Sequence, residues 1–332
     1  MGSKIKYIEF YLPEEVITNS NLEEEFHRWD SAKIEKKLGI AKRHVAGTDE
    51  TALDLAYKAS KQIFENYNKD KIDFLILCTQ SPDYFLPTTA CILQKKLELN
   101  NGVGAFDFNL GCSGFVYGLA VAKGLINSGT ARSILLVMSE TYSKHIHPKD
   151  LGNRTVFGDA AAATIIEQDE KEHIFNFELG TDGGGMNNLI VPNGALKNPK
   201  NPNLQDVTNE SGDISNPNCL YMNGPEIFNF TIEAVPKAVN NVLLKNNVTL
   251  DEIDYVIFHQ ANKYIIEFLR KKINIPEEKF FSDMLETGNT VSSTIPIGIK
   301  RALESNKIKP GNKVLLCGFG VGYSWGATMI EI

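Results

Sequence analysis

The chain repeats part of its own pattern in the same order along its length. Three short apolar segments in the first half each have a counterpart in the second half. The pairs are residues 72–77 with 253–258, 133–136 with 313–316, and 163–167 with 327–331. The first two pairs are offset by 181 and 180 residues and the third by 164, which indicates an insertion of about 16 residues between Glu140 and Ala160. Because ordered matches are typical of a duplicated unit, we expect two related halves, residues 1–172 and 173–332.

Within each half, short apolar runs alternate with amphipathic stretches. This alternation is typical of α/β proteins, in which helices cover both faces of a sheet. The predicted strands are residues 74–77, 105–108, 134–138, 256–258 and 314–317. The predicted helices are residues 51–64, 112–125, 226–244 and 263–273. A chain of 332 residues with 42% hydrophobic residues is long enough to bury a substantial core.

Charge and composition exclude several classes of function. The net charge of -7 gives no support to nucleic-acid binding, which usually needs a basic stripe. No apolar run reaches the roughly 18 residues that span a membrane, and no signal peptide is recognisable. The cysteines are widely spaced and form no Cys-x-x-Cys pair: Cys78, Cys91, Cys112, Cys219 and Cys317. We therefore expect a reduced, cytoplasmic protein without a disulfide framework and without a zinc or other metal site.

Cys112 stands at a predicted junction between a strand and a helix. It follows an apolar run, residues 103–108, and it precedes residues 113–120, which are typical of a helix start. Unpaired backbone N–H groups and the positive end of the helix dipole would favour a thiolate at this point. The small neighbours Gly111 and Gly114 would let a substrate approach closely. Cys112 is therefore a candidate nucleophile, although free cysteines are often simply buried core residues.

Other polar residues also follow predicted strands or lie in loops. His259 directly follows the predicted strand 256–258, at the kind of position where α/β proteins gather ligands. Asn289 lies in a glycine-containing loop and offers a neutral amide donor, although alone it would be a turn asparagine. His145 and His147 have a metal-like spacing, but no acidic or cysteine ligand set accompanies them. We interpret these two histidines as part of a polar loop.

Two glycine-rich or polar stretches carry further hypotheses. Residues 318–326 follow an apolar strand, but Tyr323 and Trp325 stand where a dinucleotide fingerprint needs its third glycine. This stretch is better suited to donate backbone N–H groups. Residues 194–218 are crowded with Asn, Pro, Lys, Gly and Ser, which predicts a long exposed loop. That loop is either a surface insertion or a flap over a site. A separate run of three glycines, residues 183–185, indicates a flexible turn.

Five motifs occur together and in order. They are Phe-Asp-Phe-Asn-Leu-Gly-Cys-Ser-Gly-Phe at 106–115, Phe-Gly-Asp-Ala at 157–160, His-Gln-Ala-Asn at 259–262, Gly-Asn-Thr at 288–290 and the glycines of 320–326. As a set they resemble the 3-oxoacyl-acyl-carrier-protein synthase III family of condensing enzymes, nearly from end to end. The resemblance implies an α/β fold of the thiolase-like type, in which a duplicated unit forms five layers, α-β-α-β-α. It also implies a homodimer.

The resemblance further implies a catalytic triad of Cys112, His259 and Asn289. The cysteine would take an acyl group from an acyl-CoA or an acyl-acyl-carrier-protein, and a malonyl thioester would then lose CO2 and attack the acyl group. His259 and Asn289 would donate hydrogen bonds to the enolate oxygen. The backbone N–H groups of Cys112 and of the Gly320–Val321 region would form the oxyanion hole. No cofactor is expected besides these thioester substrates.

Partner contacts are implied in the same way. The basic side chains Arg270, Lys271 and Lys272 would dock the acidic acyl carrier protein, although charge alone is equally typical of a solvated helix face. Leu86 matches a residue that reaches across the dimer into the acyl pocket of the partner. Phe319 is implied to line the acyl pocket.

Departures from the family pattern concern the acyl donor. Relatives that use CoA carry a tryptophan and an arginine that clamp the adenine, and Lys33 and Lys37 stand at these positions here. Trp29 would replace the missing tryptophan only with a shifted backbone. Tyr264 stands two residues after the His-Gln-Ala-Asn motif, where relatives usually have an arginine. These departures favour a donor other than acetyl-CoA, either another acyl-CoA or an acyl carrier protein.

Two alternative functions remain open at this stage. One keeps the acyl-cysteine intermediate but transfers the acyl group to an alcohol or an amine, without decarboxylation. The other is a non-catalytic thiolase-fold subunit. The presence of Cys112, His259 and Asn289 argues against the second alternative.

Overall fold

Two β-sheets organise the chain. The computed structural model describes residues 2–208, 212 and 214–332. The first sheet has the order β1-β7-β6-β4-β5, with β1 (Gly2–Tyr11), β4 (Phe74–Cys78), β5 (Gly104–Phe108), β6 (Ser133–Glu140) and β7 (Ala160–Asp169). The second has the order β13-β14-β15-β8, with β8 (Ile174–Thr181), β13 (Tyr255–Phe258), β14 (Lys313–Gly320) and β15 (Ser324–Glu331). Each of the five predicted strands is confirmed, and each is longer in the structure than predicted.

The two sheets repeat one strand order. In the first, β4 runs parallel to β5 and β6, β6 is antiparallel to β7, and β7 is antiparallel to β1. In the second, β13 runs parallel to β14, β14 is antiparallel to β15, and β15 is antiparallel to β8. Phe280 forms an isolated parallel bridge with Val256 of β13, at the place that β5 has beside β4. The structure therefore contains the duplication that the sequence repeat predicts.

The predicted insertion in the first copy is confirmed as well. The connection between β6 and β7 spans residues 141–159, whereas the equivalent connection between β14 and β15 spans residues 321–323 and is 16 residues shorter. The longer connection holds a 3-10 helix, Tyr142–His145, and α6 (Leu151–Arg154). It supplies part of the wall of the cavity described below.

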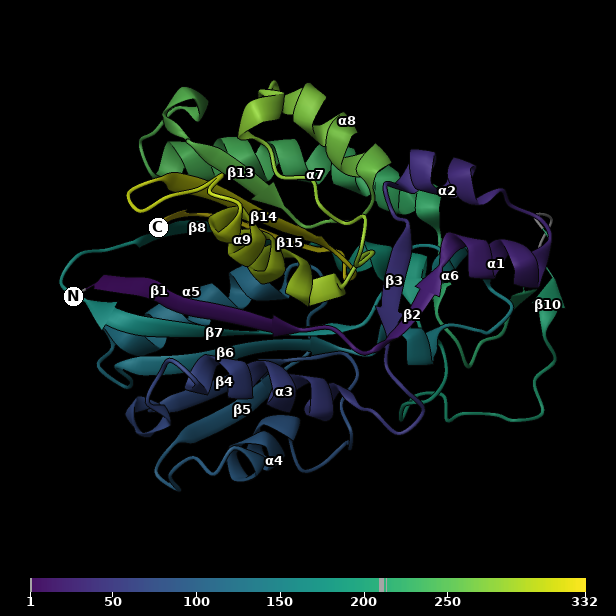
Figure 1. The fold of residues 1–332 in the computed structure, drawn as a ribbon, viewed down its shortest axis with the longest axis horizontal. Coiled ribbons are helices and arrows are strands. Elements are labelled where there is room, and N and C mark those ends of the chain that lie inside the picture. The colour runs from purple at the N-terminus through teal and green to yellow at the C-terminus, as the bar shows by residue number, and fades with distance from the viewer. Residues whose placement is uncertain (1, 209–211, 213) are drawn as a thin grey trace.

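Helices and sheets alternate in five layers (Figure 1). The helices are α3 (Ala52–Phe64) and α4 (Thr89–Lys96) outside the first sheet, α5 (Gly114–Asn127) and α9 (Thr294–Glu304) between the sheets, and α7 (Gly224–Lys245) and α8 (Lys263–Ile273) outside the second. The order is α-β-α-β-α, as the duplicated architecture requires. No helix in the described part of the chain is long and apolar enough to cross a membrane.

The two helices of the middle layer, α5 and α9, are anchored in the core. Because α5 packs against strands of both sheets, its apolar side chains are buried on more than one face, including Phe115, Leu119 and Ile126. Each such side chain stabilises the fold by about 1.5–3 kcal/mol. On α9, Ile295 and Ile299 are buried in the same core. The start of α5 and the loop before α9 are thereby held in place.

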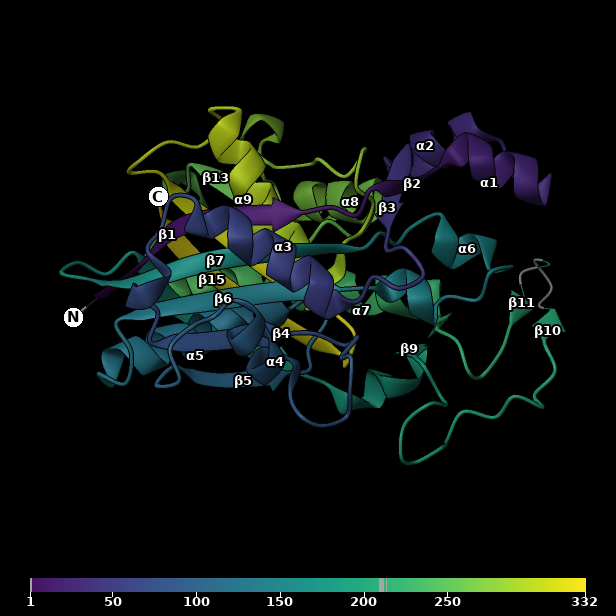
Figure 2. The same cartoon turned by 60° about the horizontal axis from the view of Figure 1, so that its bottom comes forward.

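The remaining elements lie at one end of the molecule (Figure 2). They are β2 (Glu15–Thr18), α1 (Asn19–Phe26), α2 (Ser31–Leu38), β3 (Lys42–Val45), β9 (Leu189–Ile190), β10 (Val207–Thr208), β11 (Ile214–Ser215) and β12 (Tyr221–Met222). Short 3-10 helices lie at Lys69–Lys71, Tyr142–His145, Gly183–Asn188, Leu250–Glu252, Glu277–Lys279 and Val291–Ser293. The predicted turn at 183–185 is thus the start of a 3-10 helix. Of the predicted loop 194–218, residues 209–211 and 213 lie outside the described residues, and most of the rest is exposed, as expected.

Candidate active site

Cys112 lies in the turn between β5 and α5. The helix begins at Gly114, with Ser113 as its N-cap residue, so the predicted helix 112–125 starts two residues too early. The Cys112 side chain is only 5% exposed, because the end of β14 covers it. A Cβ atom placed on Gly320 would lie 3.0 Å from the Cys112 Sγ, and one on Gly318 would lie 2.7 Å from the Cys112 carbonyl oxygen. Glycine lets the strand approach the turn this closely.

The surroundings of Cys112 favour the neutral thiol. Burial raises the pKa of the thiol to about 12, and the nearby carboxyl of Glu140 acts in the same direction. A backbone hydrogen bond lowers the pKa without offsetting burial. Burial therefore opposes the thiolate that the helix start would favour, because a charged sulfur loses more solvation than a neutral thiol does. Ionisation of this thiol would require a nearby proton acceptor.

His259 lines the same cavity as Cys112. It follows β13, and its ring is 1% exposed. Its Nδ1 lies 2.7 Å from the Thr294 Oγ1, and the Thr294 hydroxyl donates to the Val291 carbonyl at 3.1 Å. Since the hydroxyl hydrogen is directed to that carbonyl, Oγ1 accepts from Nδ1–H, which leaves Nε2 unprotonated. Burial lowers the pKa of His259 to about 3, so the resting ring is neutral.

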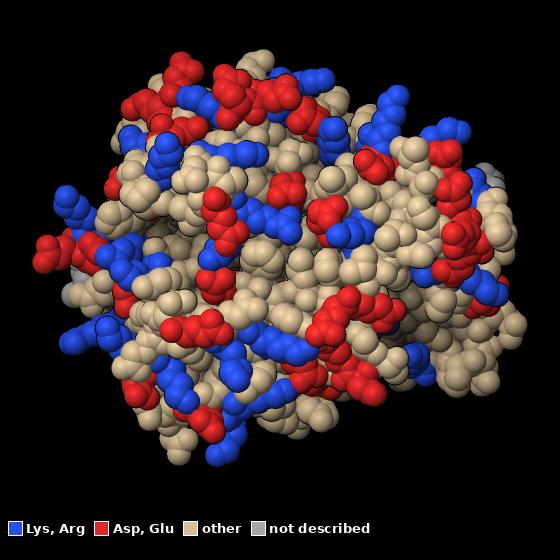
Figure 3. Space-filling view, in the orientation of Figure 1, with Lys and Arg blue, Asp and Glu red and all other residues tan. Residues whose placement is uncertain are grey.

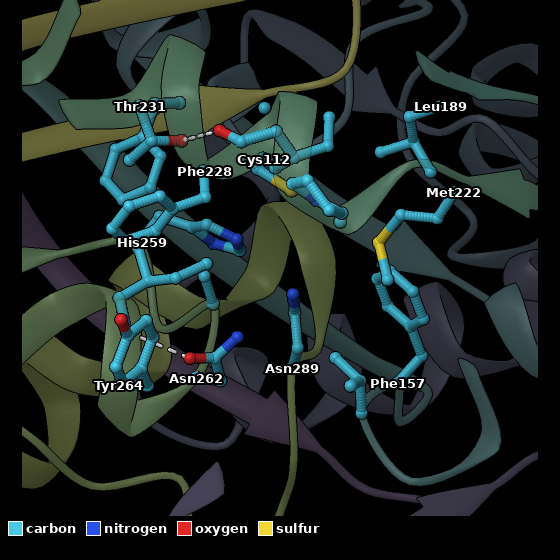
Figure 4. Close-up of a pocket in the computed structure, with 18 of the residues that line it drawn as sticks. Cys112, Phe157, Leu189, Met222, Phe228, Thr231, His259, Asn262, Tyr264 and Asn289 are labelled. Carbon is cyan, nitrogen blue, oxygen red and sulfur yellow. Dashed lines mark hydrogen bonds between the residues drawn. The ribbon is translucent and has the colours of Figure 1, made fainter. Parts of the chain in front are cut away.

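Asn289 presents only its donor group to the cavity. Its backbone N–H donates to the Val156 carbonyl at 2.9 Å, and its carbonyl accepts from the Gly158 N–H at 3.0 Å. The side-chain Oδ1 accepts from the Val291 N–H at 2.9 Å. The amide nitrogen points into the cavity (Figure 4) and has no hydrogen-bond partner among the described residues. Asn289 can therefore donate to an oxygen of a bound ligand.

A buried cation supports the segment that holds Asn289. The Arg43 side chain is 0% exposed, and its guanidinium donates to the Thr155 carbonyl and to Asn19 Oδ1, each at 2.8 Å, and to the Ile17 carbonyl at 3.2 Å. Burial lowers the pKa of Arg43 to about 10, so it stays charged at neutral pH. Arg43 thereby ties the chain next to the backbone partners of Asn289 to the β2–β3 region.

Cys112, His259 and Asn289 line one cavity of about 390 Å³ (Figure 4). They reach it from the start of α5, the end of β13 and the loop before α9. The walls are mostly apolar and include Phe157, Leu189, Met222, Ile227, Phe228, Thr231 and Phe319. Two exposed side chains, Lys37 and Tyr264, stand at the rim. Such an apolar pocket with a few convergent polar groups is typical of a ligand site.

Residues at the end of β14 lie beside the thiol. Phe319 is 2% exposed and lines the cavity, and its ring meets the His259 ring edge to face with centroids 5.5 Å apart. Gly320 lines the cavity next to Sγ. Val321 turns its side chain toward Gly111 instead, where a Cβ atom would lie 2.7 Å from its Cγ1. Val321 could therefore contribute only its backbone N–H to an oxyanion hole.

A buried network of hydrogen bonds lies behind the turn of Cys112. The carboxyl of Glu140 is 0% exposed and accepts from the Gln80 N–H and from the Ser81 hydroxyl, each at 3.0 Å. The same hydroxyl lies 3.2 Å from the His145 Nε2. Burial raises the pKa of Glu140 well above its usual range and lowers the pKa of His145. His147 has a different partner, Asp206 Oδ2, at 3.4 Å.

Comparison with known proteins shows which chains this one is similar to. The family models for 3-oxoacyl-[acyl-carrier-protein] synthase III and for its C-terminal part match residues 106–183 and 243–332. The beta-ketoacyl-[acyl-carrier-protein] synthase III of Clostridium perfringens is 34% identical over 325 residues, which cover 97% of each chain. A crystal structure of a 3-oxoacyl-(acyl-carrier-protein) synthase III is 43% identical, covers 100% of both chains and gives a TM-score of 0.98. For a Burkholderia xenovorans 3-oxoacyl-(acyl-carrier protein) synthase the values are 35% identity, 100% of this chain, 94% of that chain and 0.91.

The chain belongs to the 3-oxoacyl-acyl-carrier-protein synthase III family. It is an acyltransferase of the condensing type, and its five-layered α/β architecture is the thiolase-like fold. The fold expected from the resemblance is confirmed. The catalytic assignment within this synthase fold depends on the geometry described above.

Other predicted residues of this family member lie outside the cavity. Leu86 is 83% exposed and lies in the connection between β4 and α4. The Arg270 guanidinium is tied to the Glu267 carboxylate at 2.9 Å, and its side chain is only 12% exposed. Lys271 and Lys272 are exposed. Arg270 therefore braces α8, and only the two lysines remain available for a partner.

Some site residues carry no distinctive signal in the sequence. Thr294 begins a helix and Glu140 ends a strand, and both residue types are common at such places. The available hint for Glu140 is its position at the end of an otherwise uncharged eight-residue strand. The cavity walls come from segments far apart in sequence, including Leu189 and Met222, so only the fold brings them together.

Proposed function

We propose that the protein catalyses a decarboxylative Claisen condensation between an acyl thioester and a malonyl thioester. The observation that carries this proposal is the arrangement of Cys112, His259 and Asn289 on one apolar cavity, with a base, a nucleophile and a free amide donor. The cavity is shaped for an acyl chain and has few polar groups to hydrate a charged intermediate. The proposed reaction has two stages.

In the first stage Cys112 is acylated. The His259 Nε2 takes the thiol proton as the sulfur attacks the thioester carbonyl of the donor. Backbone N–H groups of Cys112 and of the Gly320–Val321 region would hold the oxyanion, since Gly320 lies directly beside the thiol. As the tetrahedral intermediate collapses, the leaving thiolate takes the proton back from His259. His259 is then neutral again in the acyl-enzyme.

In the second stage a malonyl thioester loses CO2, and the electron pair of the broken bond forms an enolate. The free amide of Asn289 donates to the enolate oxygen, where negative charge develops. In its resting tautomer His259 has no Nε2 hydrogen, so it adds a second donor only when protonated. The enolate carbon attacks the acyl carbonyl, the Cys112 sulfur leaves, and solvent supplies the proton that restores the thiol.

The acyl carrier protein is the proposed partner for the malonyl group. Lys271 and Lys272 on α8 are exposed and make no ion pair within the described residues, which suits an acidic protein. The reaction needs no cofactor besides its thioester substrates. A cytoplasmic location suits a free thiol nucleophile, and the five cysteines are all unpaired.

A homodimer is proposed from an exposed apolar segment. Tyr84, Phe85 and Leu86 are consecutive and are 60%, 76% and 83% exposed. They precede α4, which packs on β5, the last strand of the first sheet. Exposed apolar side chains near a sheet edge are typical of a subunit interface. We also propose that residues 1–172, with Cys112, and residues 173–332, with His259 and Asn289, act only together.

A product assay tests the proposed reaction. The protein is incubated with an acyl-CoA and malonyl-acyl-carrier-protein, or with a panel of alcohols and amines in place of the malonyl substrate. We expect a 3-ketoacyl thioester and one CO2 per turnover with the malonyl substrate only. Formation of an ester or an amide, with the malonyl thioester unused, would support transfer to an alcohol or amine instead. Absence of any acyl transfer would point to a non-catalytic subunit.

A further inference from the structure

Two buried serines, Ser113 and Ser324, meet beside the turn of Cys112. Charged side chains of both signs are interspersed on the outer face shown in Figure 3, whereas these two hydroxyls lie inside the molecule, with Ser113 0% and Ser324 2% exposed. Their oxygens are 2.6 Å apart. Ser113 directly follows Cys112, whereas Ser324 begins β15 in the second half of the chain, 211 residues later. The contact therefore joins the two halves next to the thiol.

The two hydroxyls form a chain of hydrogen bonds with one direction. The Ser324 hydroxyl donates to the Val321 carbonyl at 3.0 Å, which uses its single hydrogen. Ser324 Oγ is therefore the acceptor in its contact with Ser113, and the Ser113 hydroxyl is the donor. Ser113 is the N-cap residue of α5, yet its side chain makes no capping hydrogen bond. Its hydroxyl is thus directed to Ser324 rather than to the helix.

Val321 is held on two sides by its surroundings. Its carbonyl accepts from Ser324, and its side chain packs against the turn, where a Cβ atom on Gly111 would lie 2.7 Å from Cγ1. Its own backbone N–H has no hydrogen-bond partner among the described residues. Gly320, the residue before it, lies directly beside the Cys112 sulfur. An unpaired N–H at this point is available to an oxygen atom that is bound next to the thiol.

We propose that Ser324, held by Ser113, is a positioning residue that sets the orientation of the Val321 backbone toward the oxyanion. The inference rests on the proposed function, in which backbone N–H groups of Cys112 and of the Gly320–Val321 region hold that oxyanion. A hydrogen bond to the carbonyl limits the rotation of the residue that carries it, so the N–H of the same residue is fixed as well. Neither serine lines the active-site cavity, so both act through the backbone.

The alternative role for the two serines is to hold the turn of Cys112 in place. The two roles are distinguishable because the thiol and the oxyanion donor lie on different segments: Cys112 precedes α5, whereas Val321 follows β14. Loss of the Ser324 hydroxyl frees the Val321 carbonyl, but the turn keeps its own hydrogen bond from the Gly114 N–H to the Gly111 carbonyl at 2.8 Å. A reaction that needs an oxyanion should therefore slow more than one that needs only the thiol.

Two reactions of the same thiol test this role. Acylation of Cys112 by an acyl-CoA passes through an oxyanion, whereas alkylation by iodoacetamide displaces iodide and forms none. We expect Ser324→Ala to slow acylation about 10- to 100-fold, with the Kd of the donor unchanged, and to leave the rate of alkylation at Cys112 unchanged. Ser324→Thr keeps the hydroxyl and should restore most of the acylation rate. Ser113→Ala should slow acylation less, because Ser324 can still donate to the Val321 carbonyl.

Ser60→Ala is the matched control. Ser60 is also a buried serine that donates to a backbone carbonyl, that of Ala56 at 2.7 Å, but it lies in α3, outside the first sheet. It should behave as the wild type in both reactions. The melting temperature shows whether each variant is folded, and Ser113→Ala carries the same comparison if Ser324→Ala does not fold.

The outcomes separate the positioning role from the proposed function. Equal slowing of acylation and alkylation in Ser324→Ala would overturn the inference alone, because the serines would then hold the thiol. Unchanged acylation in that variant would overturn it as well. A wild type that is alkylated at Cys112 but acylated by no thioester would instead overturn the proposed function.

Discussion

At the scale of single residues, the site depends on buried groups kept neutral. The Cys112 thiol and the His259 ring both lose solvent, and burial moves their pKa values in opposite directions, to about 12 and about 3. With both groups neutral, the apolar cavity holds no permanent ion pair of thiolate and imidazolium. The orientation of the imidazole is then decisive, and Thr294 sets it.

Replacing Thr294 tests this orientation. Thr294→Val removes the hydroxyl that accepts from the His259 Nδ1–H and leaves a buried donor unpaired, which costs about 1–3 kcal/mol. We expect kcat to fall about 10- to 100-fold with little change in the KM of the donor. Thr294→Ser keeps the hydroxyl and should restore most of the rate. Equal loss in both variants would show that Thr294 only fills space.

Glu140 predicts a dependence of stability on pH. Because burial raises its pKa well above 4.5, the folded state keeps a proton that the unfolded state releases, so this group lowers the stability as pH rises above 4.5. Glu140→Gln carries no such proton. Urea unfolding of the variant should therefore show a free energy that falls less between about pH 5 and 8, by up to about 1.4 kcal/mol per unit. Identical slopes would mean that Glu140 is ionised in the folded protein.

At the scale of elements, the end of β14 and the start of α5 form one unit around the thiol. A Cβ atom on Gly320 would lie 3.0 Å from Sγ, so Gly320→Ala must displace either the strand or the nucleophile. We expect Cys112 acylation to slow at least about tenfold, while the melting temperature changes by only a few degrees. Gly102→Ala is the control, since a Cβ there meets nothing within 4 Å. Unchanged acylation in Gly320→Ala would contradict this account.

The elements were more predictable from the sequence than the site was. The runs at 134–138 and 314–317 are strands because buried strands need continuous apolar residues, a local property. The surroundings of Cys112 are not local: the helix start favours a thiolate, but a strand some 200 residues later buries the sulfur, and burial raises the pKa of the thiol. Thr294 and Glu140 act through contacts that no nearby sequence pattern marks.

At the scale of the whole molecule, the duplication places the site between two similar units. Cys112 lies in the turn before α5 of the first unit, while His259 follows a strand of the second, and both line one cavity. The exposed segment with Phe85 and Leu86 is the proposed contact with a second copy of the chain.

The double variant Phe85→Glu, Leu86→Glu tests this contact. It should be a folded monomer by light scattering, whereas the wild type should have twice the mass of one chain. A dimeric variant would place the interface elsewhere.

The most direct test of the account is the mass of the intact protein after incubation with an acyl-CoA. We predict one added acyl group on the wild type and on Cys91→Ala, which removes an exposed cysteine, and none on Cys112→Ala. The adduct should disappear from the wild type when malonyl-acyl-carrier-protein is added. An undiminished adduct on Cys112→Ala would contradict the central claim, because the acyl group would then be carried by another residue.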